Sequence, residues 1–262
     1  DRPMILAEAL SESCDTYFYE IGNRFYNRGK DGRTRMQQWA RTFGFGGATG
    51  LDIGGEEEGL LPTPDWRWKT FESDWDRVWN PGDSIQLSIG QKDLLVTPLQ
   101  MATFYAMLAN GGNVVSPYLV SNVEQAGAKG SPRVVLRRFA PRPLRASGVD
   151  PAALDAVRDG LYRATHSSSG TSSGSFANYP IPISGKTGTA EKVVQLPGYP
   201  SDNLEDQSWW CGWGPTDDAK IVVCALIENG GHGSTAAAPA ALRVFESFFG
   251  EKAPPSVLVQ TD

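Results

Sequence analysis

The sequence predicts an α+β fold in which an antiparallel sheet is flanked by helices. Apolar residues at helical spacing dominate residues 1–180, where a small ribbon is the main strand-like part. Three consecutive strand-like segments and one helix make up residues 181–262. A run of helices followed by a run of strands is typical of antiparallel sheets with segregated helices. We therefore expect the sheet to lie near the end of the chain.

The predicted helices follow from apolar spacing and from capping signals. Thr97-Pro98 and Asp150-Pro151 each place a capping side chain before a proline at the first helical position. Polar residues near Ser11–Asp15 predict a cap or turn that divides the first helical stretch. Residues 27–32 and the tryptophan-rich segment 66–79 are expected to be loops. The helices cover about residues 5–25 with that interruption, 33–43, 98–108, 151–164 and 236–249.

The predicted strands form two groups. Residues 114–123 and 133–139 alternate in polarity and predict a small ribbon. Trp209 and Trp210 are neighbours in a strand, so we expect one ring to face the core and the other to face the opposite side. The sheet strands are predicted at about residues 183–194, 207–214 and 219–228, with a polar insertion over 195–205.

Composition and charge limit the classes of function. The chain has 262 residues, of which 40% are hydrophobic, and its formal net charge is −6. This acidic balance argues against nucleic acid as a main partner. The sequence shows no apolar run of roughly 18 residues that could span a membrane, and no signal peptide. Asp1-Arg2-Pro3 lacks an initiator Met, so we expect a piece of a longer protein whose membrane anchor lies outside this chain.

Three cysteines, Cys14, Cys211 and Cys224, are too few for a disulfide scaffold. If Asp217-Asp218 is the tip of a hairpin, Cys211 and Cys224 lie opposite each other on paired strands. We expect two buried, reduced thiols that pack as small apolar side chains. The alternative is a disulfide bond, which requires a suitable separation of the two Cβ atoms.

The most informative motif is Ser184-Gly185-Lys186-Thr187-Gly188-Thr189-Ala190-Glu191, which predicts an edge strand. A strand edge presents unpaired N–H and C=O groups that can bind an extended peptide as an additional strand. The lysine cation and the two threonine hydroxyls suit a carboxylate at the end of such a peptide. A Lys-Thr-Gly triplet is one of three short motifs that together mark penicillin-binding proteins and serine β-lactamases.

A second candidate motif is Ser13-Cys14-Asp15. Acyl transfer to and from a serine requires protons to move between the nucleophile, a base and the leaving group. A second serine hydroxyl can relay a proton, because it both donates and accepts hydrogen bonds. The short side chain of Asp15, two residues later, can orient that hydroxyl. The alternative is that Ser13 only caps a helix.

Four segments together resemble the transpeptidase domain of the class B penicillin-binding proteins, within the elongation-specific branch. They follow one another in the family's order, and the resemblance covers nearly the whole chain. Many relatives have asparagine at the position of Asp15, and the Ser-x-Asp form is similar to the elongation-specific branch. The four segments are residues 13–19, 80–91, 96–102 and 184–191.

This resemblance implies a peptidoglycan D,D-transpeptidase that cross-links stem peptides through a serine acyl-enzyme. Such an enzyme attacks a stem peptide ending in D-Ala-D-Ala, releases the last D-Ala and passes the acyl group to an amine. β-Lactams would inhibit it covalently. The resemblance also implies a place at the outer face of the bacterial cytoplasmic membrane and a membrane glycan polymerase as a partner. The alternatives are a D,D-carboxypeptidase, a β-lactamase, or a non-catalytic module that binds β-lactams or peptidoglycan as a sensor or scaffold.

The family's nucleophile lies in a Ser-x-x-Lys motif that precedes the position of Ser13, and this chain contains no Ser-x-x-Lys. The spacing from Ser88 to Lys92 is one residue too long. We therefore expect the nucleophile to lie before Asp1 or on another chain. The first strands of the sheet and the nucleophile helix would be missing with it. The chain would then be the C-terminal portion of a transpeptidase domain, inactive alone, with a large apolar gap in its core.

The resemblance implies catalytic roles for Ser13, Asp15 and Lys186. Ser13 and Asp15 form one wall of a cleft and help to move protons. Lys186 lies on the opposite wall, attracts the anionic end of the substrate and assists the proton relay. No metal and no cofactor are predicted, since His166 and His232 have no partner at ligand spacing.

The resemblance also implies a substrate-binding role for each residue of the lysine motif. Lys186 attracts the substrate carboxylate, and the hydroxyls of Thr187 and Thr189 donate hydrogen bonds to it. Gly188 leaves room for the substrate backbone. The backbone N–H of Thr189 supplies half of an oxyanion hole, whose other half belongs to the absent nucleophile.

Overall fold

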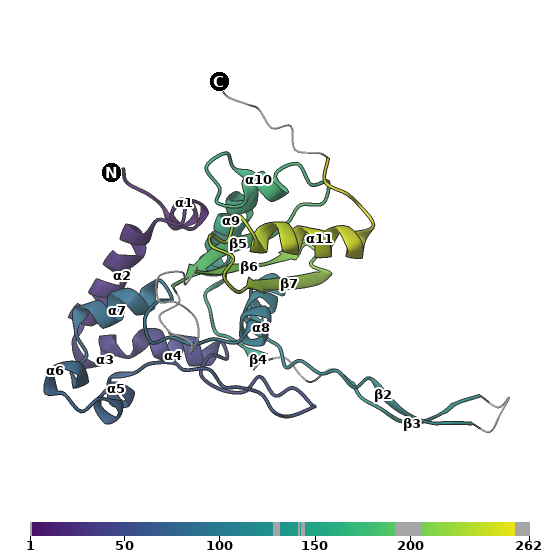
Figure 1. Ribbon diagram of the computed structural model, residues 1–262, viewed down its shortest axis with the longest axis horizontal. Helices are drawn as coiled ribbons and strands as arrows, with labels where there is room; N and C mark the ends of the chain where they lie inside the picture. The colour runs from purple at the N-terminus through teal and green to yellow at the C-terminus, as the bar shows by residue number, and fades with distance from the viewer. Residues whose placement is uncertain (1, 128–131, 141, 143–144, 192–205, 255–262) are drawn as a thin grey trace.

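The computed structural model describes residues 2–127, 132–140, 142, 145–191 and 206–254 (Figure 1). Its order of elements confirms the predicted α+β class, with the helices first and the main sheet last. The helices are α1 (Leu6–Ser11), α2 (Asp15–Asn27), α3 (Gly29–Arg33), α4 (Arg35–Thr42), α5 (Pro64–Thr70), α6 (Asp74–Arg77), α7 (Pro81–Ser88), α8 (Pro98–Ala109), α9 (Pro151–His166), α10 (Ser173–Phe176) and α11 (Ala237–Phe249). The strands are β1 (Asn113–Val114), β2 (Asn122–Gln125), β3 (Val134–Arg138), β4 (Arg145–Ala146), β5 (Ser184–Ala190), β6 (Gln207–Gly214) and β7 (Ile221–Ile227).

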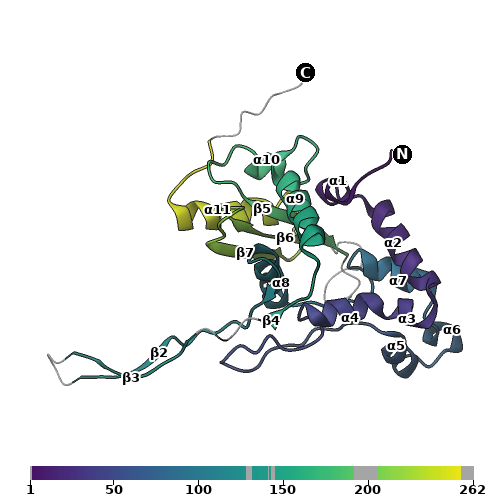
Figure 2. The ribbon, with the colours of Figure 1, turned by 180° about the vertical axis from the view of Figure 1, so that it is seen from behind.

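The main sheet is antiparallel in the order β5-β6-β7, so the lysine motif lies on an edge strand of the described sheet, as predicted. Helix α11 packs on one face of β6 and β7 and α8 packs on the other, which Figures 1 and 2 show from opposite sides. Helix α9 contacts β5 and also contacts α1. Part of the predicted first strand, residues 192–194, and the predicted insertion 195–205 lie outside the described residues.

The two faces of the sheet carry separate apolar clusters, because successive side chains of a strand point to opposite sides. Trp210 is fully buried beneath α11, and its ring centroid lies 4.7 Å from that of Phe176 and 5.8 Å from that of Phe245. Trp209 packs instead against the cluster that α8 and α9 help to form. The prediction that the neighbouring tryptophans face opposite sides is therefore confirmed.

The prediction of loops at residues 27–32 and 66–79 is wrong, because these segments contain most of α3, α5 and α6. Helix α7 was also not predicted from apolar spacing. Capping signals for two of these helices are present at Thr63-Pro64 and Asn80-Pro81, where a polar side chain precedes a proline. Both side chains accept a hydrogen bond from a backbone N–H of the first turn. The helices are too short to show a helical period, so α5 and α7 could be predicted only from their caps, and α3 and α6 have no side-chain cap.

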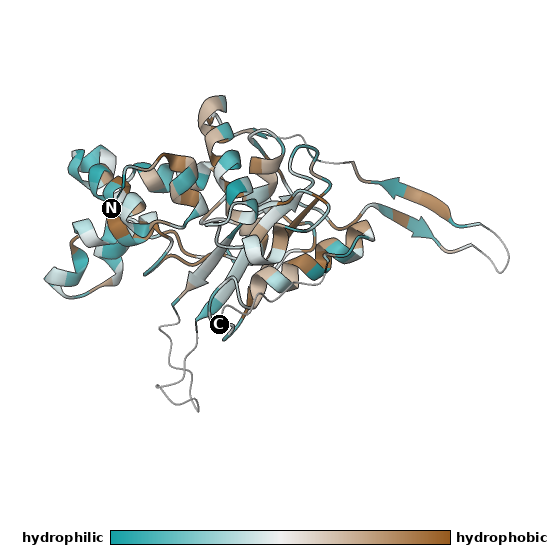
Figure 3. Cartoon of the chain, turned by 90° about the horizontal axis from the view of Figure 1, so that it is seen from above, coloured by the Kyte–Doolittle hydropathy of each residue, from teal (hydrophilic) through white to brown (hydrophobic). Residues whose placement is uncertain are grey.

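The ribbon predicted at 114–123 and 133–139 is confirmed in part by β2 and β3, because its first strand begins only at Asn122 and residues 115–121 belong to no strand. They pair antiparallel, from Asn122 opposite Arg138 to Gln125 opposite Val134. All residues of the two strands are exposed. Figure 3 shows the ribbon standing out from the rest of the molecule, with apolar stretches on its strands. The ribbon therefore contributes little to the core around the lysine motif.

Cys211 and Cys224 form a disulfide bond between β6 and β7. They lie directly opposite each other, as a hairpin centred on Asp217-Asp218 predicts. The expectation of two reduced thiols is therefore wrong. Direct cross-strand pairing puts both side chains on the same face of the sheet and brings their Cα atoms within 4.2 Å. Cys14 is free.

Candidate active site

Lys186 lies at the centre of a set of polar contacts on β5. Its Nζ donates a hydrogen bond to the Thr171 hydroxyl at 3.3 Å, and to the carbonyl and hydroxyl oxygens of Thr187 at 2.9 and 3.0 Å. The Thr187 hydroxyl donates to the Thr171 hydroxyl at 2.8 Å. Pairing with Cys211 of β6 holds Lys186 in register. No carboxylate of the described residues forms an ion pair with this ammonium, which leaves it available to an anion.

Desolvation lowers the pKa of Lys186 from 10.5 to about 8, and the negative charge of Asp15 opposes this shift. Because the folded-state pKa lies below the unfolded-state value, the charged lysine opposes folding at pH values below about 8. That destabilisation disappears as the pH rises from about 8 to 10.5. The carboxylate of Asp15 therefore acts on the charge of Lys186, while a common site for the two motifs stays a prediction.

Gln91 and the glycine-rich loop at Gly233 hold Thr189, near the C-terminal end of the lysine motif. Gln91 Nε2 donates to the carbonyl oxygen of Thr189 at 2.9 Å, and the Gly233 N–H donates to the Thr189 hydroxyl at 3.3 Å. A Cβ added at Gly233 would lie 2.6 Å from the carbonyl oxygen of Gly188, so a larger residue at 233 would displace β5. A Cβ added at Gly188 would lie 3.2 Å from the Cβ of Trp209, which gives that glycine a packing role as well.

Ser13 lies in the turn between α1 and α2, with a left-handed φ of 54°. The turn closes because the Cys14 N–H donates to the Ala9 carbonyl at 2.9 Å, and α2 then begins at Asp15. This confirms the predicted interruption of the first helical stretch. A left-handed residue other than glycine costs about 1–2 kcal/mol, and such positions cluster at functional sites. Ser13 is therefore an exposed residue in a strained conformation, and the functional role of its hydroxyl stays a prediction.

Thr171 connects the serine turn with the lysine strand. Its backbone N–H donates to the Ser11 carbonyl at 3.2 Å, while its hydroxyl accepts from Lys186. The Ser11 hydroxyl also lies 3.1 Å from the hydroxyl of Ser167, on the same connecting segment. Ser13 is two residues beyond Ser11. The turn and the strand are thus joined through one short chain of hydrogen bonds.

A cavity of about 550 Å³ opens along β5 and is bounded by α4, α7 and α8. Residues Lys186–Ala190 line it together with mostly apolar side chains, including Met36 and Trp209. Ser13 and Asp15 are not among its lining residues. The structure therefore brings the four residues of the lysine motif to one cavity and leaves the serine motif beside it. A cleft that both motifs line stays a prediction.

Three residues that were not predicted contact the lysine motif: Thr171, Gln91 and Gly233. Gln91 belongs to segment 80–91, on which the family resemblance partly rests. Gly233 belongs to a glycine-rich loop, and Thr171 belongs to a run of serines and glycines just before β5. Thr171 precedes the motif closely in sequence and its hydroxyl was a usable signal, whereas the contacts of Gln91 and Gly233 depend on tertiary packing.

Among the described residues, no group of three or more His, Cys, Asp or Glu side chains is arranged to hold a metal ion. Within that same part of the chain, no helix has the length and apolar character needed to cross a bilayer.

The thiol of Cys14 lies at the start of α2. A hydrogen bond with the Thr16 hydroxyl is the main cause that lowers the pKa of this thiol.

Comparisons with known proteins identify the family to which this chain belongs. The model of the penicillin binding protein transpeptidase domain matches residues 1–246. Peptidoglycan D,D-transpeptidase MrdA of Haemophilus influenzae is 34% identical over 258 residues, which cover 95% of this chain and 37% of that protein. The crystal structure of Pseudomonas aeruginosa PBP2 in complex with WCK 5153 has a TM-score of 0.74 at 31% identity, covering 97% of this chain and 52% of that one. A chain from a peptidoglycan synthase complex has a TM-score of 0.70 at 32% identity, covering 97% and 39%.

The fold and the lysine-bearing edge strand define a transpeptidase-type domain of the α+β class. The chain belongs to the penicillin-binding protein transpeptidase family, and its relatives MrdA and PBP2 confirm the elongation-specific class B branch that the motifs indicate. It spans 37% of the length of the Haemophilus influenzae relative and 52% of the Pseudomonas aeruginosa chain.

Proposed function

We propose that this chain is the C-terminal portion of the transpeptidase domain of a peptidoglycan D,D-transpeptidase, which cross-links stem peptides through a serine acyl-enzyme. The observation that carries the proposal is Lys186, a half-buried ammonium on an edge strand. Thr171 and Thr187 hold it, and no described carboxylate pairs with it. The carboxylate of a stem peptide ending in D-Ala-D-Ala suits this position. β-Lactams carry a comparable carboxylate and are proposed as covalent inhibitors.

Ser13 and Lys186 are proposed to move the proton during acyl transfer. The attacking serine forms a bond to the substrate carbonyl carbon, the peptide C–N bond breaks, and the serine proton ends on the amine of the leaving D-Ala. The Ser13 hydroxyl can pass that proton because it donates and accepts hydrogen bonds. Asp15 favours the cationic form of Lys186, which in turn holds the substrate carboxylate.

The rest of the lysine motif is proposed to position the peptide. The Thr187 hydroxyl already contacts Lys186 and Thr171, so substrate binding would exchange one of these hydrogen bonds for one to the carboxylate. Thr189 offers a second hydroxyl, and the chain at Gly188 lets the substrate backbone come close. The Thr189 N–H is proposed as one oxyanion donor, worth about 3 kcal/mol in comparable sites.

The nucleophilic serine is proposed to lie in a Ser-x-x-Lys segment outside this chain, in the missing N-terminal part of the same protein or on another chain. The cavity of about 550 Å³ supports this idea, because its mostly apolar walls can receive a helix beside Lys186. The described sheet would then gain the strands that precede such a helix.

We also propose a location at the outer face of the bacterial cytoplasmic membrane, with the anchor outside this chain. The Cys211–Cys224 disulfide supports it, since such bonds persist in oxidising compartments. A membrane glycan polymerase is proposed as a partner. The similarity to a chain of a peptidoglycan synthase complex, from a structure concerned with polymerization and crosslinking, supports that partner.

Labelling of the full-length protein with a fluorescent penicillin tests the proposal. We expect a covalent adduct on a serine outside residues 1–262, and slower labelling of a Lys186→Met variant that remains folded. Incubation with peptidoglycan fragments and an acceptor amine then separates the activities: cross-linked dimers support a transpeptidase, and release of D-Ala alone supports a D,D-carboxypeptidase.

The absence of Ser-x-x-Lys from this chain favours a second candidate function, which is a non-catalytic sensor or scaffold that binds β-lactams or peptidoglycan. A full-length protein that the penicillin does not label would establish this second candidate.

A further inference from the structure

A second cavity lies across α4 from the active-site cavity. Helix α4 presents Met36 and Ala40 to the active-site cavity, whereas Gln37 and Arg41 line the second one. The second cavity has a volume of about 680 Å³, and residues of α3, α5, α6 and the segment after α6 complete its wall. We call it the basic cavity and define it by Lys30, Arg33, Gln37, Arg41, Trp68 and Arg77.

The basic cavity concentrates positive charge in an acidic protein. Four cations line it, and Asp65 is the one acidic residue among its lining residues. Asp65 pairs with Lys69 at 2.8 Å, on the helix α5. Lys30, Arg33 and Arg41 form no ion pair with any residue that the structure describes. Because the whole chain has a formal net charge of −6, this cluster of uncompensated cations is a local exception that attracts an anion.

Two buried polar atoms in the wall also lack partners. Arg33 Nε and Gln37 Oε1 are buried and form no hydrogen bond within the described chain. Gln37 is 1% exposed, and its Nε2 donates to the Pro62 carbonyl at 3.2 Å. A buried polar group without a partner costs about 1–3 kcal/mol. A ligand with hydroxyl and acid groups would supply these partners, which makes the wall resemble a binding site.

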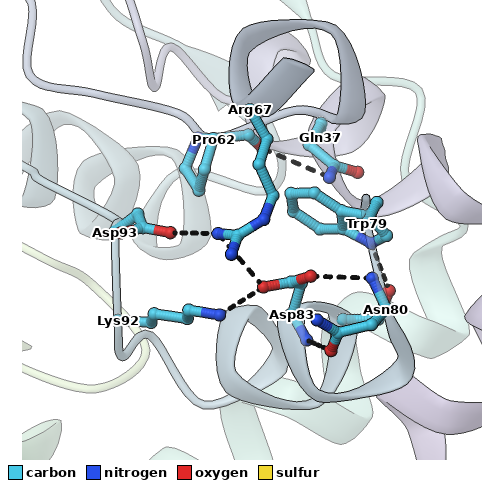
Figure 4. A network of polar contacts seen from close by, with 9 residues as sticks. Gln37, Pro62, Arg67, Trp79, Asn80, Asp83, Lys92 and Asp93 are labelled. Carbon is cyan, nitrogen blue, oxygen red and sulfur yellow. Dashed lines mark hydrogen bonds and ion pairs between the residues drawn. The ribbon is translucent and has the colours of Figure 1, made fainter. Parts of the chain in front are cut away.

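The neighbouring buried network pairs its charges, although Arg67 Nε also lacks a hydrogen bond within the described chain (Figure 4). Arg67 pairs with Asp83 at 3.4 Å and with Asp93 at 3.2 Å, and Lys92 also forms an ion pair with Asp83. Trp79 lines the basic cavity, and its Nε1 donates a hydrogen bond to the hydroxyl of Ser84. Ser84 lies on α7, the helix that also carries Asp83. Two cations and two carboxylates therefore balance behind the wall. Of the cations that face the cavity, Arg77 lies 3.8 Å from a carboxylate oxygen of Asp74, whereas the other three have no such partner among the described residues.

An exposed tryptophan completes the basic cavity. Trp68 is 55% exposed, and the guanidinium carbon of Arg77 lies 5.4 Å from the centre of its ring. An indole ring offers a broad apolar face at little conformational cost. The C–H face of a pyranose ring can lie on such a surface. Cations beside an exposed ring thus favour a ligand that combines acid groups with a saccharide.

We propose that the basic cavity binds a carboxylate-bearing glycan–peptide, a segment of a peptidoglycan strand, away from the acyl-transfer site. The ligand class rests on the proposed function, because peptidoglycan is the polymer on which that function acts. Stem-peptide carboxylates would contact Lys30, Arg33 and Arg41. A sugar ring would lie against Trp68. A volume of about 680 Å³ lies within the range of ordinary ligand sites. The cavity would hold a strand on the protein while the active site acts on a stem peptide.

Binding of a soluble disaccharide–tetrapeptide to the full-length protein, after a penicillin has blocked the active site, tests this proposal by calorimetry. We expect saturable binding that weakens at high salt, because ion pairs contribute. The double variant Lys30→Gln/Arg41→Gln should bind roughly tenfold or more weakly, since it loses two charge-assisted contacts. Trp68→Ala should also weaken binding.

Two matched controls should leave binding unchanged. Arg24→Gln removes an exposed cation of α2, and Trp75→Ala removes a 91% exposed ring outside the cavity.

Three results would overturn the proposal. The first is unchanged affinity in both the double variant and Trp68→Ala. The second is loss of all binding once penicillin occupies the active site, which would assign the probe to that site alone. The third is equal binding of the probe with its carboxylates amidated, or equal competition by inorganic phosphate, which would exclude recognition of a carboxylate-bearing glycan–peptide. Failure of the fluorescent penicillin to label the protein would instead count against the proposed function, so the two failures are distinguishable.

Discussion

The lysine strand and the serine turn are the two candidate sides of the active site, and they are built differently. Lys186 and its neighbours on β5 are held by strand pairing and by contacts from Thr171, Gln91 and Gly233. Ser13 lies in an exposed left-handed turn, and its side chain forms no hydrogen bond within the described chain. The lysine strand is therefore held in place before substrate binds. The hydroxyl of Ser13 must instead find its hydrogen-bond partner on the substrate or on a segment outside the described residues.

The largest expected effect is on the stability of the lysine side. Replacing both Cys211 and Cys224 by serine removes a cross-link between residues separated by 13 positions. We expect a loss of about 3 kcal/mol in the free energy of unfolding, because the unfolded chain regains loop freedom. Denaturant unfolding of the full-length protein measures it. Cys14→Ser, on the serine side, is the matched control and should leave stability unchanged. Equal stability of the double variant would show that the disulfide does not support this side.

A second prediction concerns the charge on the lysine side. Lys186→Met keeps most of the side-chain volume and removes the ammonium. We expect the rate constant for acylation by a carboxylate-bearing penicillin to fall roughly tenfold to a hundredfold, because a charge-assisted contact with the carboxylate is lost. Stopped-flow or gel-based labelling measures that rate constant. Labelling of the variant at the wild-type rate would show that Lys186 does not hold the carboxylate.

A third prediction separates strain from function on the serine side. Ser13→Gly should raise the free energy of unfolding by about 1 kcal/mol, since glycine adopts a positive φ without strain. The same change should slow acylation because it removes the relay hydroxyl. Ser13→Ala is the matched variant: it should slow acylation equally without the gain in stability. Full acylation activity in Ser13→Gly would mean that the hydroxyl has no part in the proton relay.

A fourth prediction concerns the pH dependence of acylation. Since the pKa of Lys186 is lowered to about 8, the ammonium loses its proton as the pH rises through that value. Acylation by a carboxylate-bearing penicillin should therefore decline above about pH 8, by at most about tenfold per pH unit. Lys186→Arg keeps its charge in this range and should show a flat profile, whatever its absolute rate. A wild-type profile that stays level to pH 10 would contradict the account.

The sequence predicts the lysine side better than the serine side. An apolar-to-polar run with a compact motif predicts β5, so Lys186, Thr187 and Thr189 could be assigned to an edge strand before the strand partners were known. Local patterns also predict the break at Ser13 and the opposite faces of the paired tryptophans. Contacts such as Gln91 with Thr189 depend on how distant segments pack, and no local pattern contains that information. The disulfide failed as a prediction because register alone does not reveal whether two thiols are oxidised.

The account depends on one shared environment for Asp15 and Lys186, and titration of the Lys186 side chain measures it most directly. Carbon-13 NMR of the lysine Cε in the full-length protein would report the ionisation of this ammonium, with Lys186→Arg to assign the signal. We predict a midpoint at about pH 8 in the wild type and a lower midpoint in Asp15→Asn, because the carboxylate raises the lysine pKa. The same midpoint in both proteins, or a wild-type value near 10.5, would show that the two motifs do not form a common site.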